Sequence, residues 1–65
     1  MNPPNRLMQF FKYEHLPEHL QGVSAACAKL AQMMDEMLPE KAEKTAGLRK
    51  LMEARDCFCR ALIEK

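Results

Sequence analysis

The spacing of apolar residues between Pro17 and Pro39 constrains the fold more than any other feature of the sequence. From Leu16 onward these residues recur at alternating intervals of four and three positions. Such a heptad-like seam is typical of an amphipathic helix that packs against another helix. The seam consists of Leu16, Leu20, Val23, Cys27, Leu30, Met34 and Met37.

A ridge of small side chains lies beside this seam and is formed by Ser24, Ala25, Ala28 and Ala31. Small side chains let a neighbouring helix approach closely, but alanine is also a strong helix former in its own right. The sequence therefore leaves open whether the ridge is a packing surface.

Prolines divide the chain into three segments. A residue that precedes a proline is biased away from the helical conformation, so helix boundaries are expected at the prolines. We predict one domain with an N-terminal arm over residues 1–16, a helix over 17–38 and a second helix over 40–64. Within the arm, Asn5 is placed to cap a short helix that extends to Lys12.

The segment after Pro39 has a second amphipathic pattern. Gly47 lies inside it at a cost of about 1 kcal/mol relative to alanine, which indicates a kink or a close contact. On the charged face, Asp56 and Arg60 have the spacing of an i,i+4 ion pair. Two long helices joined by a short proline turn predict an all-α fold, an antiparallel two-helix hairpin with a short N-terminal helix or arm. The apolar stripe consists of Leu48, Leu51, Met52, Phe58, Cys59, Leu62 and Ile63.

The length of the chain limits how stable a single copy can be. A chain of 65 residues buries only about 60% of the surface that it exposes when unfolded. Its three cysteines are an odd number, and Cys57 and Cys59 point too far apart on a helix to bridge each other. Because the two long helices are more widely apolar than one hairpin can bury, we expect self-association into a helical oligomer.

Composition and charge exclude several classes of function. The formal net charge is +1, so the chain has no global attraction to duplex nucleic acid or to an anionic membrane. No segment resembles a signal peptide, and no apolar run approaches the roughly 20 residues of a membrane span, which predicts a cytosolic protein with reduced thiols. No nucleophile with a base, no paired carboxylates and no Gly-rich phosphate loop can be identified. We therefore expect no enzyme and no cofactor.

Arg55 is the most informative single residue. Helical geometry places it in the middle of the apolar stripe, between Leu48 and Leu62. A charge at such a position must be paired, or must face a cavity or an anion. Two interpretations stay open. Arg55 either sets the packing register with its stem along the apolar surface, or binds phosphate at an oligomer interface, for which a planar guanidinium is well suited.

Other polar constellations carry weaker signals. His15 and His19 have the i,i+4 spacing of helical zinc ligands, but Pro17 interrupts the helix between them and no third ligand is spaced to join them, so we expect no metal site. The cysteines lack a Cys-x-x-Cys knuckle and are predicted to be core or interface residues. Tyr13 lies in an aromatic and basic segment, where it either anchors the arm or stacks on a nucleobase.

Three strings of the sequence together resemble a known family. They are Phe-Lys-Tyr-Glu-His-Leu-Pro at 11–17, Leu-Gln-Gly-Val-Ser at 20–24, and Ala-Gly-Leu-Arg-Lys-Leu-Met-Glu-Ala-Arg-Asp at 46–56. In this order and spacing they are similar to a family of small phage helical-hairpin proteins. Its members include the anti-CBASS cyclic-oligonucleotide sponges and the helical part of the anti-Thoeris sponges.

The resemblance implies a hexamer of helical hairpins that sequesters immune messengers in the host bacterial cytoplasm. The messenger is held between protomers without being cleaved. It is a cyclic dinucleotide, a cyclic trinucleotide or a cyclic ADP-ribose isomer, and the sequence leaves this choice open. Carried onto this chain, the resemblance makes Tyr13 the candidate for base stacking and Arg49, Arg55 and Arg60 the candidates for binding phosphate. Ser24 is a further candidate, because it stands about where the anti-CBASS branch has a basic residue.

A second hypothesis is a helical oligomer that has no small ligand and binds other proteins through its helix faces. Arg55 separates the two hypotheses, because a pure packing module has little use for a cation in its apolar stripe. An RNA-binding hairpin is a third, weaker hypothesis, because charges of both signs are mixed on the second long helix.

Overall fold

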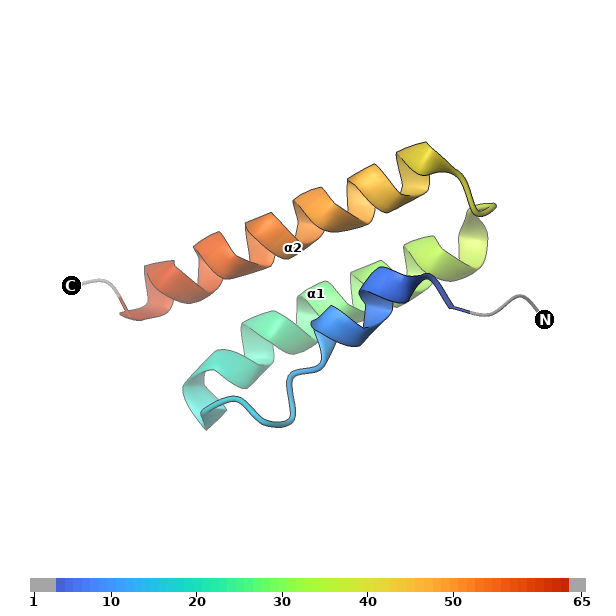
Figure 1. The fold of residues 1–65 in the computed structure, drawn as a ribbon. Coiled ribbons are helices and arrows are strands. Elements are labelled where there is room, and N and C mark those ends of the chain that lie inside the picture. The colour runs from blue at the N-terminus through green and yellow to red at the C-terminus, as the bar shows by residue number, and fades with distance from the viewer. Residues whose placement is uncertain (1–3, 64–65) are drawn as a thin grey trace.

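The structure is a computed structural model that describes residues 4–63, and these residues form three helical elements. The 3₁₀-helix η1 (Arg6–Phe11) is followed by the α-helices α1 (Glu18–Met37) and α2 (Ala42–Ile63). The two long helices lie side by side and antiparallel, and η1 packs along them (Figure 1). Residues 4–63 contain no strand. The prediction of an all-α helical hairpin with a short N-terminal helix is confirmed.

Local chemistry explains where each helix begins and ends. The side chain of Asn5 accepts a hydrogen bond of 2.9 Å from the backbone N–H of Leu7, so Asn5 caps η1 as the sequence predicts. The helix α1 begins directly after Pro17. At its other end the N–H of Leu38 donates to the carbonyl of Met34, and Leu38 itself is extended because a proline follows it.

Both long helices are slightly shorter than the predicted segments over 17–38 and 40–64. The helix α2 begins two residues after the predicted position, at Ala42. This delay leaves Glu40 outside the helix, where its side chain joins a polar network. The first three residues of the predicted arm and the predicted end of the second helix at Glu64 lie outside the described residues.

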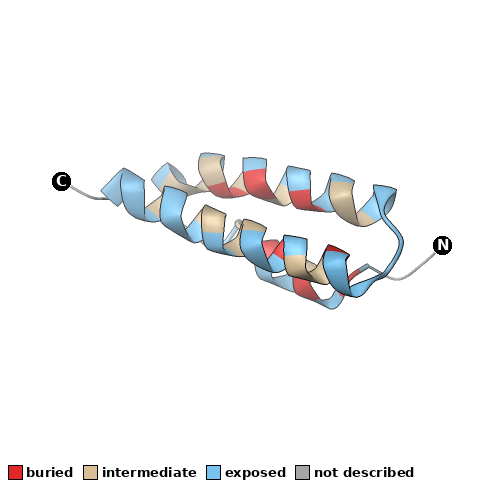
Figure 2. Cartoon of the chain, turned by 90° about the horizontal axis from the view of Figure 1, so that it is seen from above, coloured by how far each residue is buried: buried red, intermediate tan, exposed pale blue. Residues whose placement is uncertain are grey.

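The core lies where η1 packs against both long helices. Leu7 and Phe11 of η1 are buried together with Ala31 of α1 and Leu48 of α2. Figure 2 shows buried segments where the helices face one another. Two of the three large side chains in this cluster belong to the arm. Burying a Leu or Phe side chain contributes about 1.5–3 kcal/mol. The hairpin therefore depends on the arm to complete its core.

The face of α1 that packs inward is the ridge of small residues. Ser24 and Ala31 are both 0% exposed. In the predicted seam Cys27 is buried, whereas Leu30 and Met37 are exposed, so the prediction that the seam forms the packing face is only partly correct. Small side chains allow α2 and η1 to approach the backbone of α1, and this close approach turns the larger residues beside the ridge toward solvent.

The apolar stripe of α2 is buried only in its first half. Leu48 is 2% exposed, whereas Phe58, Leu62 and Ile63 near the end of the helix are between 49% and 59% exposed. A single copy of the chain therefore leaves a large apolar surface uncovered at this end. None of the helices in residues 4–63 combines the length and the apolarity that crossing a membrane requires.

Gly47 does not make the close contact that the sequence suggested. It lies within the uninterrupted helix α2, and a Cβ atom added there would meet no other heavy atom within 4 Å. Within one chain nothing explains the glycine at this position.

Candidate ligand-binding cleft

A cleft of about 200 Å³ opens where the end of the arm meets the first turns of α1 and the last turns of α2. One wall comes from the arm, and the other walls come from the two helices. The lining residues are Phe10, Lys12, His15, Leu16, Leu20, Ser24, Arg55, Asp56 and Cys59. Three segments that are distant in the sequence thus bring two cations, an imidazole, a hydroxyl and an aromatic ring to one place.

Arg55 spans the cleft from α2 to the arm. Its Nε and Nη2 donate to Oδ1 of Asp56 at 3.2 and 3.0 Å, and its Nη1 donates to the backbone carbonyl of Phe10. The guanidinium carbon also lies 5.5 Å from the centre of the Phe11 ring, a cation–π contact. The side chain is only 15% exposed. Arg55 therefore has the partners that its position in the apolar stripe requires, and it ties α2 to the arm.

Ser24 and Cys59 lie in the buried part of the cleft. The Oγ atom of Ser24 is 3.4 Å from the Sγ atom of Cys59, so the hydroxyl and the thiol share a hydrogen bond between α1 and α2. Cys27, one turn further along α1, is buried, and this burial raises the pKa of its thiol. An un-ionised thiol behaves as a small apolar group, as the sequence predicts for the cysteines.

The structure brings together only two of the five site residues predicted from the sequence. Ser24 and Arg55 both line the cleft, whereas Tyr13, Arg49 and Arg60 do not. Tyr13 belongs to the turn between the arm and α1, where its carbonyl accepts a 3.0 Å hydrogen bond from the N–H of Leu16. The backbone of Tyr13 therefore forms part of that turn.

The two other arginines lie on the exposed side of α2. Arg49 is exposed and is not among the lining residues. Arg60 donates to the Sγ atom of Cys57 at 3.2 Å. The predicted ion pair between Asp56 and Arg60 is wrong, because the carboxylate of Asp56 turns instead to Arg55, its neighbour in the sequence.

Sequence reasoning missed several residues of the cleft, although a signal for them was present. Phe10, Lys12 and His15 surround Tyr13 in the aromatic and basic segment that the sequence singled out. The aromatic and basic segment therefore borders the cleft, although Tyr13 itself does not line it. Phe10 is half exposed and is the aromatic residue among those that line the cleft.

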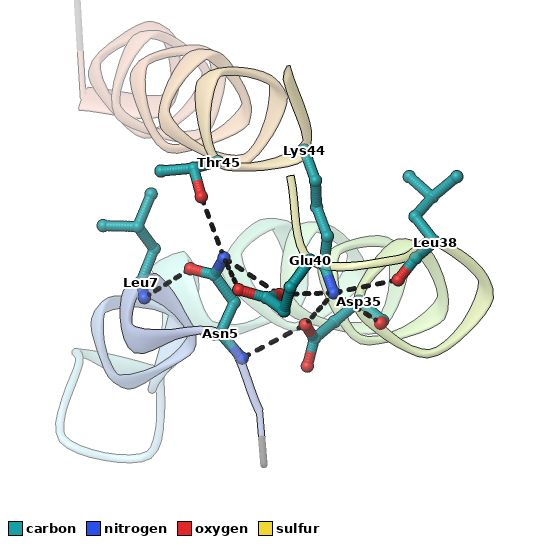
Figure 3. A network of polar contacts seen from close by, with 7 residues as sticks. All are labelled: Asn5, Leu7, Asp35, Leu38, Glu40, Lys44 and Thr45. Carbon is teal, nitrogen blue, oxygen red and sulfur yellow. Dashed lines mark hydrogen bonds and ion pairs between the residues drawn. The ribbon is translucent and has the colours of Figure 1, made fainter. Parts of the chain in front are cut away.

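A second polar cluster closes the opposite end of the hairpin (Figure 3). The Nζ atom of Lys44 lies 2.8 Å from Oδ1 of Asp35 and 2.7 Å from Oε1 of Glu40, and it also donates to the carbonyls of Asp35 and Leu38. The side chain of Lys44 is 5% exposed. It therefore pairs with two carboxylates, which leaves one net negative charge in the cluster, and it satisfies backbone carbonyls at the end of α1.

Asn5 joins the arm to this cluster. Its side-chain amide donates to both carboxylate oxygens of Glu40 and to Oγ1 of Thr45, and its backbone N–H donates to Asp35. Hydrogen bonds to Lys44 are the main cause that lowers the pKa of Asp35 and of Glu40, and the same contacts raise the pKa of Lys44. Among the described residues every buried side-chain nitrogen and oxygen has a partner, and the buried polar atoms of this cluster find theirs within the chain.

Metal-ligating side chains do not gather in the described part of the chain. Residues 4–63 hold no group of three or more His, Cys, Asp or Glu side chains placed to bind an ion. His15 faces the cleft, and His19 is exposed on the first turns of α1.

The cleft therefore offers donors for an anion and an aromatic ring beside them, in a volume suited to a small group. Comparisons of the chain with protein-family models, with curated proteins and with solved structures each find no significant match.

Proposed function

We propose that the chain binds a cyclic nucleotide messenger and sequesters it without cleaving it, at sites completed by further copies of the chain. The observation that carries this proposal is the cleft in which Arg55 and Lys12 lie beside the half-exposed ring of Phe10. Guanidinium groups bind phosphate through charge-assisted hydrogen bonds, and aromatic rings stack on nucleobases. The cleft combines both kinds of contact.

The size of the cleft favours a shared site. Pockets for small molecules usually measure about 300–1,000 Å³, so a cleft of about 200 Å³ accommodates one nucleotide unit at most. A cyclic ligand with two or three phosphates would need two or three such clefts, which rotational symmetry in an oligomer brings together. The exposed Phe58, Leu62 and Ile63 provide apolar surface for that assembly, which the family resemblance suggests is a hexamer.

Sequestration requires no catalytic machinery. Tight binding and an excess of protein over messenger are sufficient, so the proposal agrees with a chain that has no recognisable catalytic set. Under the family resemblance, the protein acts in the host bacterial cytoplasm, where it withdraws cyclic di- or trinucleotides or cyclic ADP-ribose isomers from an immune receptor.

The alternative is a helical oligomer that binds only other proteins. The internal partners of Arg55 favour this alternative, because they give the cation a structural role without any ligand. Apolar helix ends left exposed are equally suited to a protein partner.

A thermal-shift screen of cyclic di- and trinucleotides and cyclic ADP-ribose isomers tests the proposal. A ligand at 100 times its Kd should add about 2.7 kcal/mol of stability per site. Heat-denaturing the complex should then release unaltered ligand by chromatography, and light scattering at micromolar concentration should show an oligomer. The absence of a shift with every ligand would favour the alternative, and recovery of a linear product would indicate an enzyme.

Arg55→Met separates the two functions most directly. The substitution keeps the packing of the stem and removes the charge, so ligand affinity should fall by about 2–5 kcal/mol. Lys50→Met is the matched control, because Lys50 is an exposed cation on the same helix but outside the cleft, and it should leave affinity unchanged. A large drop in melting temperature for Arg55→Met with unchanged affinity would show that Arg55 serves only the fold.

A further inference from the structure

We propose that the cleft of a single chain binds the terminal phosphate of a linear nucleotide, a phosphomonoester, and prefers this doubly charged group to a singly charged phosphodiester. The charged residues that line the cleft carry this inference, since two of them are cations and one is an acid. The inference goes beyond the proposed function, because it assigns a ligand that is not cyclic to one cleft of one chain.

The first argument is the net charge of the cleft. Lys12 and Arg55 each contribute one positive charge and Asp56 contributes one negative charge, which leaves one net positive charge. His15 also lines the cleft and adds no negative charge in either protonation state. A phosphodiester carries one negative charge, whereas a phosphomonoester carries close to two at neutral pH. A net positive site attracts the dianion more strongly.

The acid nearest to this segment in the sequence does not cancel that charge inside the cleft. Glu14 is exposed and is not among the lining residues. Its carboxylate accepts a 3.2 Å hydrogen bond from the backbone N–H of Tyr13, which does not line the cleft either. Asp56 is therefore the acid that reduces the charge of the cleft, and it does so by one unit.

The second argument is the supply of donors. Arg55 has five N–H groups, and the described residues accept from three of them: Asp56 from Nε and Nη2, and the carbonyl of Phe10 from Nη1. One N–H on each terminal nitrogen remains for a ligand. Lys12 adds an ammonium group from the arm, so the two cations belong to different walls of the cleft.

A phosphomonoester suits donors that come from two walls. It has three terminal oxygen atoms that accept hydrogen bonds, whereas a diester has two. The volume of about 200 Å³ also favours a small group with a single phosphate. The half-exposed ring of Phe10 lines the same cleft, where it is placed to contact the nucleoside that carries the phosphate.

This preference has a consequence for sequestration. Hydrolysis of one phosphodiester opens a cyclic oligonucleotide and leaves a terminal phosphomonoester, so a linear product competes for each cleft with an advantage in charge. A cyclic messenger offsets this advantage by binding several clefts of an oligomer at once, which raises its overall affinity without new contacts. The oligomer, and not the single cleft, would then distinguish the messenger from linear nucleotides.

The experiment compares two fragments that differ in charge. Methyl phosphate and dimethyl phosphate are titrated into the full chain at about pH 8, where the monoester is a dianion. The ionic strength is about 0.1 M, at which exposed charges more than about 10 Å apart are largely screened. Binding is followed by NMR at the side-chain N–H groups of Arg55. The variants are Lys12→Met, which removes one cation from the cleft, and Asp56→Asn, which removes its acid.

The matched control is Lys29→Met, because Lys29 is an exposed lysine of α1 that does not line the cleft. A unit charge about 4 Å away in water changes affinity about fivefold per ligand charge. The wild-type chain should therefore bind methyl phosphate about fivefold more tightly than dimethyl phosphate. Lys12→Met should abolish this preference, and Asp56→Asn should raise it to about 25-fold. Lys29→Met should leave it within about twofold.

Four results would overturn the inference. They are equal or tighter binding of dimethyl phosphate by the wild type, an unchanged preference in Lys12→Met, an equal loss of preference in Lys29→Met, and no perturbation of the Arg55 signals by either fragment. The proposed function is tested separately by the cyclic-nucleotide screen. A cyclic ligand found there without a preference for methyl phosphate removes only the present inference, whereas the preference without any cyclic ligand removes only the proposed function.

Discussion

The two ends of the hairpin differ in how their polar groups are paired. At the turn end, Lys44 is enclosed between Asp35 and Glu40, and the arm is fastened to the same cluster by Asn5. At the other end, α2 extends past the arm with its large apolar side chains exposed, and the polar groups face an open cleft. The turn end pairs its charged and polar groups within the chain but leaves Met37 and Leu38 exposed, whereas the cleft end leaves both polar and apolar groups open to a partner or a ligand.

The arm connects these two ends. Asn5 lies in the polar cluster at the turn, Leu7 and Phe11 fill the core, and Phe10 and Lys12 line the cleft. A short 3₁₀-helix is weak by itself, so its position depends on contacts along its whole length. The stability of the turn end thereby determines how well one wall of the cleft is placed.

A matched pair of truncations on α2 tests whether its C-terminal end is left unpacked in a single chain. Leu48→Ala removes a side chain that is 2% exposed, and Leu62→Ala removes one that is 49% exposed. The first should lower the free energy of unfolding by about 2–5 kcal/mol, and the second by less than about 1 kcal/mol in the monomer. Urea denaturation at low protein concentration measures both. Equal losses would mean that the C-terminal end is packed within one chain.

Asn5→Ala tests whether the arm is fastened at the turn. It removes the cap of η1 and the donor to Glu40 and Thr45, so stability should fall by about 2 kcal/mol. Asn5→Asp keeps the capping acceptor but adds a negative charge beside Glu40, and it should be no more stable than Asn5→Ala. Gln9→Ala is the control on the exposed side of η1. A wild-type melting temperature for Asn5→Ala would show that the core alone holds the arm.

The ion pairs at the turn predict sensitivity to acid. Hydrogen bonds to Lys44 hold the pKa of Asp35 and Glu40 below their ordinary values of 3.8 and 4.5. The native state therefore binds these protons more weakly than the unfolded chain does. The stabilisation is complete above the ordinary values and is lost as the pH falls through the lowered ones.

The melting temperature should thus decline as the pH is lowered through and below the range of 3.8 to 4.5. Lys44→Met should flatten this decline, because it removes the partner of both carboxylates. Lys41→Met, an exposed lysine just before α2, should leave the slope unchanged. A slope in Lys44→Met as steep as in the wild type would place the acid sensitivity elsewhere.

The smallest expected effect comes from the two glycines within the helices. A Cβ atom at Gly22 or at Gly47 would meet nothing within 4 Å, so Gly→Ala at either position should stabilise the single chain by about 0.5–1 kcal/mol. Gly47 also borders an apolar groove of about 280 Å³ between α1 and α2. Calorimetry at low and high protein concentration compares the two variants. If Gly47→Ala loses its gain at high concentration while Gly22→Ala keeps it, a second chain approaches closely at Gly47.

Local features of the sequence determined the elements of this protein. Apolar spacing predicts both long helices, the prolines predict their separation, and Asn5 predicts the capped start of the arm. These features act through neighbours only a few positions away, so they can be predicted from the sequence alone. Helical geometry likewise places Arg55 in an apolar stripe. This position predicts that its charge is paired, as it is with Asp56.

Tertiary structure alone decided which surfaces and side chains meet. It buried the small ridge of α1 in place of Leu30 and Met37, because close approach of α2 and η1 requires small residues on the facing side. It placed Phe10 instead of Tyr13 at the cleft and brought the backbone N–H of Asn5 to the Asp35 carboxylate that also pairs with Lys44. Contacts between segments thirty or more positions apart depend on how the arm folds back across both helices, and helical periodicity carries no information about that.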